Sequence, residues 1–406
     1  KTSTLAAIAE ALKPKKGIYI AFNKSISVEA QSKMPANVMA CTVHSLAFRD
    51  IGWIYKNRLR LGAISGKEIA NTLNLSERNG QSATQIGSII VETLKIFCQS
   101  HDCEIQKRHL PEEKISSLIN MMSQFEASRL NIDLINGDKL KISEHREKVN
   151  MWRKFLELEI LDGATVIWEQ FQSLESKLPV THDMYLKVWA LKKPKLPFDF
   201  ILFDEAQDAN PVLLHLLQEQ QSQLIVVGDR YQQIYSWRGS VNAMSTFKTI
   251  HSCCLSQSFR FGQSIANVAN SILKNYLGAA VEIRGNNNIK SLVGACEPNA
   301  IIFRTNGSML GTLMGLIKNN EQVYIEGGVK ELTSQIRAAI CLKKGERTES
   351  SMFDIYKNWQ EVEDAAKDND ELAQFISLFE RFDALSLLDA LEKVSSVKDS
   401  KNITLT

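Results

Sequence analysis

The sequence predicts an α/β protein made of two parallel-sheet lobes, each of which carries a helical insertion. Two short apolar runs, residues 200–203 and 224–227, end in polar residues and are separated by a segment long enough for a helix. Such runs are typical of strands buried in a parallel sheet that is covered on both faces. Strand and helix patterns alternate again after His251, and this alternation predicts the second lobe.

Length and composition narrow the class of protein. A chain of 406 residues exceeds the usual size of one domain, and its net charge of only +2 means that any basic track for nucleic acid must be local. Seven cysteines without a C-x-x-C pair predict reduced thiols and a cytoplasmic protein. No apolar run approaches the ~18 residues of a membrane span. Because the chain begins without Met and ends on a strand-like run, we expect an internal fragment of a longer protein.

The first elements alternate in the order expected for an α/β lobe. Helical spacing at the start stops before Pro14, and two strand patterns follow, with a helix between them. The predicted ranges are 1–12 for the first helix, 17–22 for a strand, 25–33 for a helix and 37–41 for a strand.

Helical patterns dominate two later parts of the chain, and they set the predicted domain boundaries. Long amphipathic stretches replace strand signals after the first lobe begins, and charge-rich helical patterns recur near the end of the chain. We expect a first lobe at 1–63 and 188–250 with an insertion at 64–187, and a second, incomplete lobe at 251–335 and 398–406 with a short insertion at 336–397. Strands of the second lobe are predicted at 300–303, 322–325 and 402–406, with helices at 263–276 and 308–318.

Acidic and amide side chains follow the two apolar runs. Asp204 and Glu205 end the first run, with Gln207 and Asp208 close behind, and Asp229 and Gln232 follow the second run. Because parallel strands present their carboxyl ends at one edge, these side chains should cluster there. A nucleotide hydrolase needs one carboxylate to hold Mg²⁺ and another to orient or deprotonate water. An isolated Asp-Glu pair is more often a solvated turn, but the second polar edge favours the functional interpretation.

Lys1, Thr2 and Ser3 open the first helix and match the end of a phosphate-binding loop. In that loop the Lys reaches the β- and γ-phosphates, and the hydroxyl group binds Mg²⁺. The glycines of the loop are not in this sequence. The match is weak on its own, and an exposed Lys at a helix start is the simpler alternative.

Residues 228–239 carry the most specific pattern. The segment holds Asp229 and two Gln, followed by Tyr235, Trp237 and Arg238, all within twelve residues after a strand. Gln232 is placed to sense a γ-phosphate, and Tyr235 and Trp237, next to Arg238, are suited to stacking on bases. The alternative for the two aromatic residues is a place in the core.

Further candidates lie at other predicted strand ends and at the start of the second lobe. Arg260 could neutralise charge on a γ-phosphate across a cleft, or form only a surface ion pair. Contacts with DNA are predicted for Phe22, Asn23, Thr42 and His44, which as isolated residues would more often serve in caps and turns.

Taken together, these motifs resemble superfamily 1 DNA helicases of the UvrD/Rep type, and the wording of residues 21–26 and 42–48 is most similar to the F-box DNA helicase branch. The resemblance covers nearly the whole chain in order. It implies two RecA-like lobes of the P-loop NTPase fold, ATP and Mg²⁺ as cofactors, and 3′→5′ movement on single-stranded DNA. By position it places Lys1 and Thr2 in the phosphate loop, Asp204 on Mg²⁺, Glu205 on the attacking water, Gln232 and Arg260 on the γ-phosphate, and Phe22, Asn23, His44, Tyr235 and Trp237 on or near DNA.

The predicted function is that of an ATP-dependent DNA helicase or translocase in DNA repair, recombination or replication. Its partners would be single-stranded DNA and single-strand/duplex junctions, and it would act as a monomeric motor without a membrane, associated with the nucleoid or in a nucleus. Two alternatives stay open. One is an ATP-driven or nuclease-associated translocase that does not separate strands, and the other is a fragment that binds single-stranded DNA without turnover.

Overall fold

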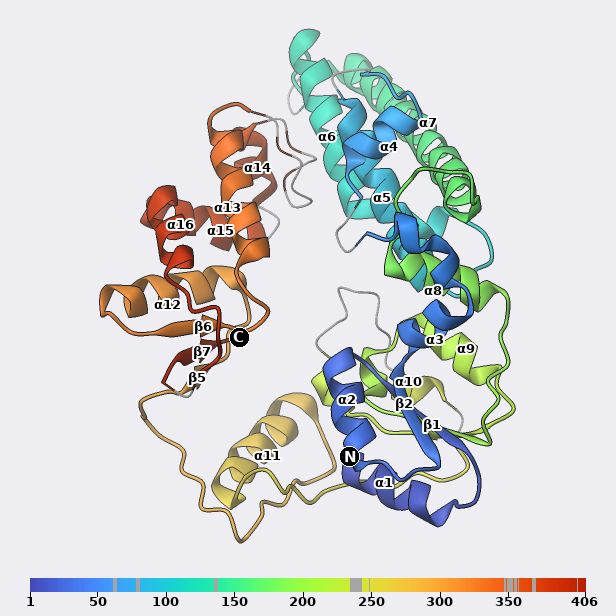
Figure 1. Ribbon diagram of the computed structural model, residues 1–406. Coiled ribbons are helices and arrows are strands. Elements are labelled where there is room, and N and C mark those ends of the chain that lie inside the picture. Colours follow the sequence, from blue (N-terminus) through green and yellow to red (C-terminus); the bar gives the residue numbers. More distant parts are fainter. Residues whose placement is uncertain are drawn as a thin grey trace.

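The computed structural model describes residues 1–60, 64–77, 81–134, 138–233, 243–247, 249–346, 348, 353, 356, 358–366, 370–399 and 401–406. Figure 1 shows two sheets in separate parts of the molecule, joined by the segment that carries one isolated helix, α11, while a long bundle of helices rises beside the first sheet. The mixed α/β architecture with parallel sheets confirms the predicted fold class.

The first sheet is parallel, and its strand order among the described residues is β2-β1-β3-β4. Its strands are β1 (Gly17–Ala21), β2 (Val38–Thr42), β3 (Phe200–Phe203) and β4 (Gln223–Val226). The flanking helices and 3-10 turns are α1 (Thr2–Ala11), α2 (Lys24–Lys33), α3 (Val43–Asp50), η1 (Gly52–Arg58), η3 (Ala206–Asp208), α9 (Pro211–Gln218), η4 (Arg230–Gln232) and α10 (Ala243–Thr246). β1 pairs directly with β3, with Gly17 opposite Phe200, so two distant parts of the chain form the centre of the sheet.

The two faces of this sheet bury alternate residues of the same strands. Ile18 and Ile20 of β1 belong to one hydrophobic cluster, and Tyr19 belongs to another that includes Leu5 of α1 and Ala30 of α2. This alternation is what a strand covered on both faces requires. β4 differs from the prediction of a fully buried strand: Gln223 is exposed and the other three residues are half-buried, because among the described residues β4 has a neighbouring strand on one side only.

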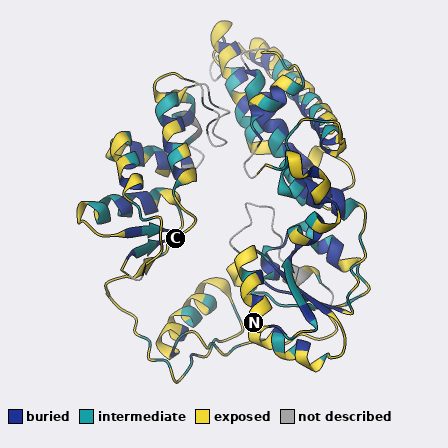
Figure 2. Cartoon of the chain, viewed as in Figure 1, coloured by how far each residue is buried: buried dark blue, intermediate teal, exposed yellow. Residues whose placement is uncertain are grey.

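A helical segment lies between β2 and β3 in the chain. It comprises α4 (Gly66–Thr72), α5 (Ala83–Gln99), η2 (Lys107–His109), α6 (Glu112–Arg129), α7 (Lys139–Gln172) and α8 (His182–Leu191). Its core is continuous with one face of the first sheet, since Ile89, Phe97 and Trp168 share a cluster with Ile201. Figure 2 shows this buried layer running from the sheet up into the bundle. The amphipathic stretches in the sequence therefore correspond to helices in the structure.

α4 and α5 approach each other through two glycines. A Cβ atom added to Gly87 would lie 2.0 Å from the carbonyl oxygen of Gly66 and 3.1 Å from the nitrogen of Ala70. These neighbours are backbone atoms, which cannot rotate away as a side chain does. Helix packing this close requires residues without side chains at the crossing point.

The helical segment leaves and re-enters the first sheet along two helices that pack together, α3 and α8. The indole nitrogen of Trp189 donates a hydrogen bond of 2.6 Å to Asp50, and His44 Nε2 lies 3.2 Å from a carboxylate oxygen of Asp183. These contacts hold the entry and exit of the helical segment side by side.

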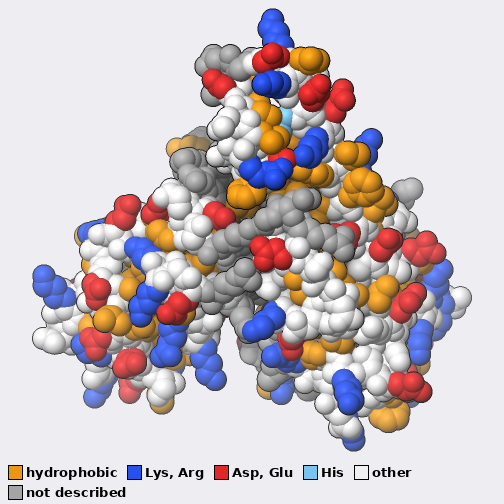
Figure 3. Space-filling model, turned by 90° about the horizontal axis from the view of Figure 1, so that it is seen from above, with side chains coloured by type: hydrophobic (Ala, Val, Ile, Leu, Met, Phe, Trp, Pro, Cys, Tyr) orange, Lys and Arg blue, Asp and Glu red, His pale blue; other side chains and the backbone are white. Residues whose placement is uncertain are grey.

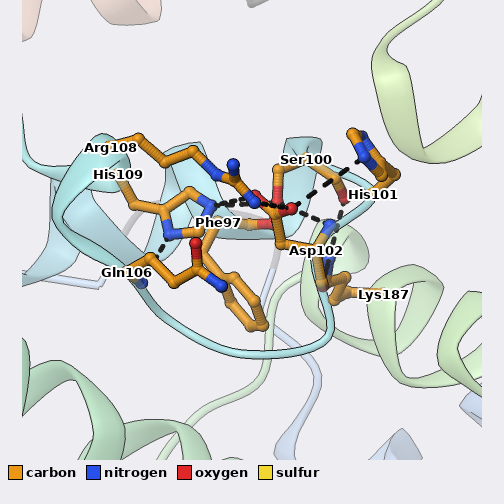
Figure 4. A network of polar contacts seen from close by, with 8 residues as sticks. All are labelled: Phe97, Ser100, His101, Asp102, Gln106, Arg108, His109 and Lys187. Atoms are coloured by element: carbon orange, nitrogen blue, oxygen red, sulfur yellow. Dashed lines mark hydrogen bonds and ion pairs between the residues drawn. The ribbon is translucent and has the colours of Figure 1, made fainter.

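A buried polar network ties the end of α5 to α8 (Figure 4). The Lys187 ammonium group donates to the carbonyl oxygens of Ser100 at 2.7 Å and Asp102 at 2.6 Å, and it lies 4.2 Å from the centre of the Phe97 ring. Burial lowers the pKa of Lys187 to about 8. Its partners are carbonyl oxygens and an aromatic face, so we interpret Lys187 as a structural residue.

The carboxylate of Asp102 completes this network. It accepts hydrogen bonds from Arg108 Nε at 2.7 Å and from His109 Nε2 at 2.8 Å, while His109 Nδ1 accepts from the backbone N–H of Gln106. Burial alone would raise the pKa of Asp102, but the hydrogen bonds from Arg108 and His109 hold it below its usual value. Each charged group in the network is paired, as buried charges require.

The second sheet is also parallel, with the strand order β5-β7-β6. This part of the chain comprises α11 (Gln263–Leu277), β5 (Ala300–Ile301), α12 (Asn306–Lys318), β6 (Val323–Ile325), α13 (Lys330–Lys343), α14 (Trp359–Ala365), α15 (Asp370–Arg381), α16 (Ala384–Glu392) and β7 (Ile403–Leu405). Leu310, Ile336 and Leu405 belong to its separate core. Within the described parts of the chain, no helix has the length and apolarity needed to span a bilayer.

Candidate nucleotide and DNA site

Asp204 stands at the carboxyl end of β3 and is held by a tyrosine from the neighbouring strand. The hydroxyl group of Tyr19 donates to Asp204 Oδ2 at 2.5 Å, and the backbone N–H of Glu205 donates to Oδ1 at 2.9 Å. Both Tyr19 and Asp204 are buried. Burial, followed by the hydrogen bond to Asp204, raises the pKa of Tyr19, so its hydroxyl group stays protonated and acts as a donor.

Glu205 follows in a left-handed backbone conformation, with φ of 50° and ψ of 45°. Its carboxylate forms an ion pair with the ammonium group of Lys1 and accepts a hydrogen bond of 3.0 Å from Gln207 Nε2. Burial would raise the pKa of Glu205, but Lys1, Gln207 and the charge of Arg260 together hold it below its usual value. Glu205 is therefore a carboxylate at neutral pH.

The end of β4 is joined to the end of β3 through Gln207. The backbone N–H of Asp229 donates to Gln207 Oε1 at 2.9 Å, and Gln232 Nε2 donates to Asp229 Oδ2 at 2.7 Å. The predicted clustering of these acidic and amide side chains at one sheet edge is thus present in the structure. Lys1, from the start of α1, reaches the same edge.

Arg260 lies in the segment that leads to α11 and is exposed. Its charge lowers the pKa of Glu205 and also contributes to the lowered pKa of Glu29, whose main cause is the hydrogen bond from Lys33. The sequence did not point to Glu29 as a neighbour of Arg260. Arg260 is therefore near the edge that carries Glu205.

The residues predicted to contact DNA lie in different kinds of position. Asn23 and Thr42 serve as helix caps, since their side chains accept hydrogen bonds from the backbone N–H groups of Ile26 and Ser45. Phe22 is half-buried beside Asn23, and His44 faces α8. The other candidates, Tyr235, Trp237 and Arg238, lie outside the described residues.

Basic side chains form no single patch on the face seen in Figure 3, where Lys and Arg are interspersed with Asp and Glu. This distribution agrees with the nearly balanced net charge of +2. A groove of about 630 Å³ lies in the helical segment, between α4 and residues 170–179.

Asp208 differs from its neighbours because its carboxyl group is poorly stabilised. Its Oδ1 is buried without a hydrogen-bond partner, and burial, together with the charge of Glu205, raises the pKa of Asp208 to about 6. A raised pKa means that the ionised form is less stable in the folded protein than in the unfolded chain. The stability that the protonated form provides is present below about pH 4 and is lost as pH rises through 6.

We therefore expect Asp208→Asn to stabilise the protein at pH 7.5 by about 1–2 kcal/mol, after allowance for solvent screening. The gain should shrink as pH falls towards 4.5. Urea unfolding without ATP or Mg²⁺ at both pH values measures it, with the exposed Asp162→Asn on α7 as the control. A gain that does not change with pH would contradict this account of Asp208.

The residues at this edge fit Mg²⁺ and a nucleotide. The hydroxyl group of Thr2 and the carboxylate of Asp204 both contact Tyr19, so they lie together as hard oxygen donors of the kind that Mg²⁺ prefers. Lys1 supplies a positive charge beside them, and the unpartnered oxygen of Asp208 adds acceptor capacity.

Comparison with protein families identifies residues 9–252 as a UvrD/REP helicase N-terminal domain. The chain belongs to this family. The matched residues include the ends of β3 and β4 with Glu205, Gln207 and Asp229, whereas Lys1, Thr2, Ser3 and Arg260 lie outside the match. The family assignment confirms the resemblance to UvrD/Rep-type helicases.

Individual relatives support the same assignment. The chain is 32% identical over 371 residues to F-box DNA helicase 1 of Gallus gallus, with 91% of this chain and 33% of the relative covered. It is 26% identical over 444 residues to F-box DNA helicase protein 1 of Schizosaccharomyces pombe, with 99% and 46% covered. A shorter match, 33% over 84 residues, covers 19% of this chain and 11% of the ATP-dependent DNA helicase PcrA of Leuconostoc citreum. The chain therefore spans about a third to a half of the length of the two F-box relatives.

The sequence alone missed Tyr19 as a site residue of this UvrD-family chain. Tyr19 was placed correctly in a strand, but its hydroxyl group carries information only once β1 is known to pair with β3. A polar-tipped aromatic residue inside an otherwise apolar strand was the available signal.

Proposed function

We propose that the full-length protein is an ATP-driven motor that moves 3′→5′ on single-stranded DNA and unwinds duplex DNA. The observation that carries this proposal is the connected set of side chains at one sheet edge, from Lys1 through Glu205 and Gln207 to Asp229 and Gln232. Such a set links groups suited to phosphate with the segment that precedes Tyr235 and Trp237.

In the proposed mechanism, Lys1, Thr2 and Ser3 contact the phosphates and Asp229 supports this edge. Glu205 accepts the proton of the water that attacks the γ-phosphate, and the bond between the β- and γ-phosphates breaks. Gln232 and Arg260 respond to the γ-phosphate. Thr2 and Asp204 would hold Mg²⁺, which would supply positive charge to offset the charge on the phosphate oxygens.

DNA would lie along residues that follow the strand ends. We assign Phe22, Asn23, Thr42 and His44 to one part of this track, and Tyr235, Trp237 and Arg238 to another, where bases stack at ~1–3 kcal/mol each. We also propose that residues 1–63 and 188–250 form one RecA-like lobe and 251–335 with 398–406 part of a second, with insertions at 64–187 and 336–397. Because this motor would act on DNA, we propose that the protein is located with the genome, in a nucleoid or a nucleus.

The test uses the full-length protein with radiolabelled ATP and three DNA substrates: a duplex with a 3′ single-stranded tail, one with a 5′ tail, and a blunt duplex. Single-stranded DNA should stimulate hydrolysis, and the 3′-tailed duplex should be unwound faster than the other two. Stimulated hydrolysis without unwinding would instead identify a translocase. DNA binding without hydrolysis would identify a binding protein and overturn the proposal.

A further inference from the structure

Gln207 occupies an unusual position between the two strand ends. Its side chain is 2% exposed, so both ends of its amide must find partners inside the protein. Nε2 donates to Glu205 Oε2 at 3.0 Å and to Asp208 Oδ2 at 3.3 Å, and Oε1 accepts from the backbone N–H of Asp229 at 2.9 Å. The neighbours dictate the orientation of the amide, because carboxylates need a donor and an N–H needs an acceptor.

The backbone around Gln207 is built for this contact. A Cβ atom added to Gly228 would lie 2.9 Å from Gln207 Oε1 and 3.3 Å from the nitrogen of Ala206. A side chain at this position would push against the end of the Gln207 amide, so the glycine favours the close approach of the turn that follows β4. A backbone hydrogen bond from Ala206 to the carbonyl oxygen of Val227, at 3.1 Å, fixes the same approach.

The contact continues from Asp229 into the following turn. Its carboxylate accepts hydrogen bonds from the backbone N–H of Tyr231 at 3.0 Å and from Gln232 Nε2 at 2.7 Å. A displacement of this turn therefore moves the N–H of Asp229, and with it the acceptor end of the Gln207 amide. The donor end is bonded to Glu205.

The Glu205 carboxylate needs the hydrogen bond from Gln207, because its other partner, Lys1, is also the proposed ligand of the phosphates. Its left-handed backbone, with φ of 50°, persists only when surrounding groups determine it. Lys1 pairs with its carboxylate, but Lys1 is also the proposed phosphate ligand, so the two contacts compete. The hydrogen bond from Gln207 does not compete with phosphate.

We propose that Gln207 is a positioning residue that couples the orientation of the Glu205 carboxylate to the position of the turn beginning at Gly228, so that DNA bound beyond this turn sets the rate of ATP hydrolysis. This inference rests on the proposed function and names the residue that couples DNA binding to ATP hydrolysis. Gln207 itself does not take part in proton transfer.

The test compares full-length wild type with Gln207→Met, which keeps the length of the side chain and removes its hydrogen bonds. The ratio of kcat with single-stranded DNA to kcat without it should fall at least about tenfold, while KM for ATP changes less than about threefold. Gly228→Ala, which keeps the Gln207 side chain but crowds its Oε1 where this atom accepts the backbone N–H of Asp229, should produce the same loss.

Gln220→Met is the matched control. Gln220 also bridges backbone groups, donating to the carbonyl oxygens of Pro194 at 3.0 Å and Leu216 at 2.8 Å, but it lies at the opposite end of α9 from the site. This variant should leave the DNA stimulation ratio unchanged. An unchanged ratio in both Gln207→Met and Gly228→Ala, with wild-type stimulation present, overturns this inference alone; absent stimulation in the wild type overturns the proposed function as well. Should Gln207→Met fail to fold, Gly228→Ala decides.

Discussion

Glu205→Gln in the full-length protein should lower the DNA-stimulated kcat for ATP hydrolysis by about 10²–10⁴, the range typical of losing a general base. The substitution keeps the shape of the side chain but removes the carboxylate that accepts a proton. Glu205 is suited to this role because Lys1, Gln207 and Arg260 keep it ionised at neutral pH despite partial burial. ATP hydrolysis with saturating single-stranded DNA measures the loss.

Nucleotide binding should survive the same substitution, since Lys1 and Thr2 remain. Glu219→Gln, at the exposed end of α9, is the control and should leave kcat unchanged. Near-wild-type hydrolysis by Glu205→Gln would show that another group activates the water, and the assignment of the base would then be wrong.

Gly87→Ala should destabilise the protein by at least about 2 kcal/mol, as overpacking against rigid neighbours does. Helix propensity alone predicts the opposite sign, because replacing a helix-interior Gly by Ala contributes about 1 kcal/mol of stability. At this position the added Cβ would lie 2.0 Å from the carbonyl oxygen of Gly66, so α4 and α5 must separate. Urea unfolding followed by circular dichroism measures the loss.

Gly163→Ala provides the matched comparison on α7. Its Cβ would lie 2.8 Å from the terminal methyl carbon Cδ1 of Ile90, the end of a flexible side chain that can rotate. Propensity and repacking should nearly cancel there, leaving a change within about 1 kcal/mol. Equal effects of the two substitutions would show that the contact between α4 and α5 is not rigid.

Strands and most helices could be predicted because apolar runs and hydrophobic periodicity are visible in short stretches of sequence. The apolar run at 200–203 became β3 without a shift, and residues 223–226 became β4 one residue earlier than expected. Clustering at the sheet edge followed from one general rule, that parallel strands share the edge at which their carboxyl ends lie. The family match confirms the resemblance to UvrD/Rep-type helicases.

Other features depend on contacts between segments far apart in the chain. The hydrogen bond from Tyr19 to Asp204 arises only when β1 and β3 are neighbours, and Glu205 meets Lys1 only when the start of the chain lies beside β3. The burial of Lys187 likewise depends on distant partners, since the carbonyl oxygens that accept its hydrogen bonds come from residues 100 and 102. Caps such as Thr42 were recognisable as an alternative, and their possible contact with DNA remains a prediction.

The pairing of β1 with β3 also has a consequence for folding during synthesis on the ribosome. Lys16 and Asp199, which join the two strands at one end, are 183 residues apart, and the whole helical segment is synthesised between them. At about 5–20 residues per second, a ribosome needs roughly 10–40 s to deliver β3 after β1 has emerged. During that interval Ile18 and Ile20, fully buried in the finished protein, lack the strand that lies beside them in the sheet, so their apolar side chains stay accessible on the nascent chain until β3 has been made.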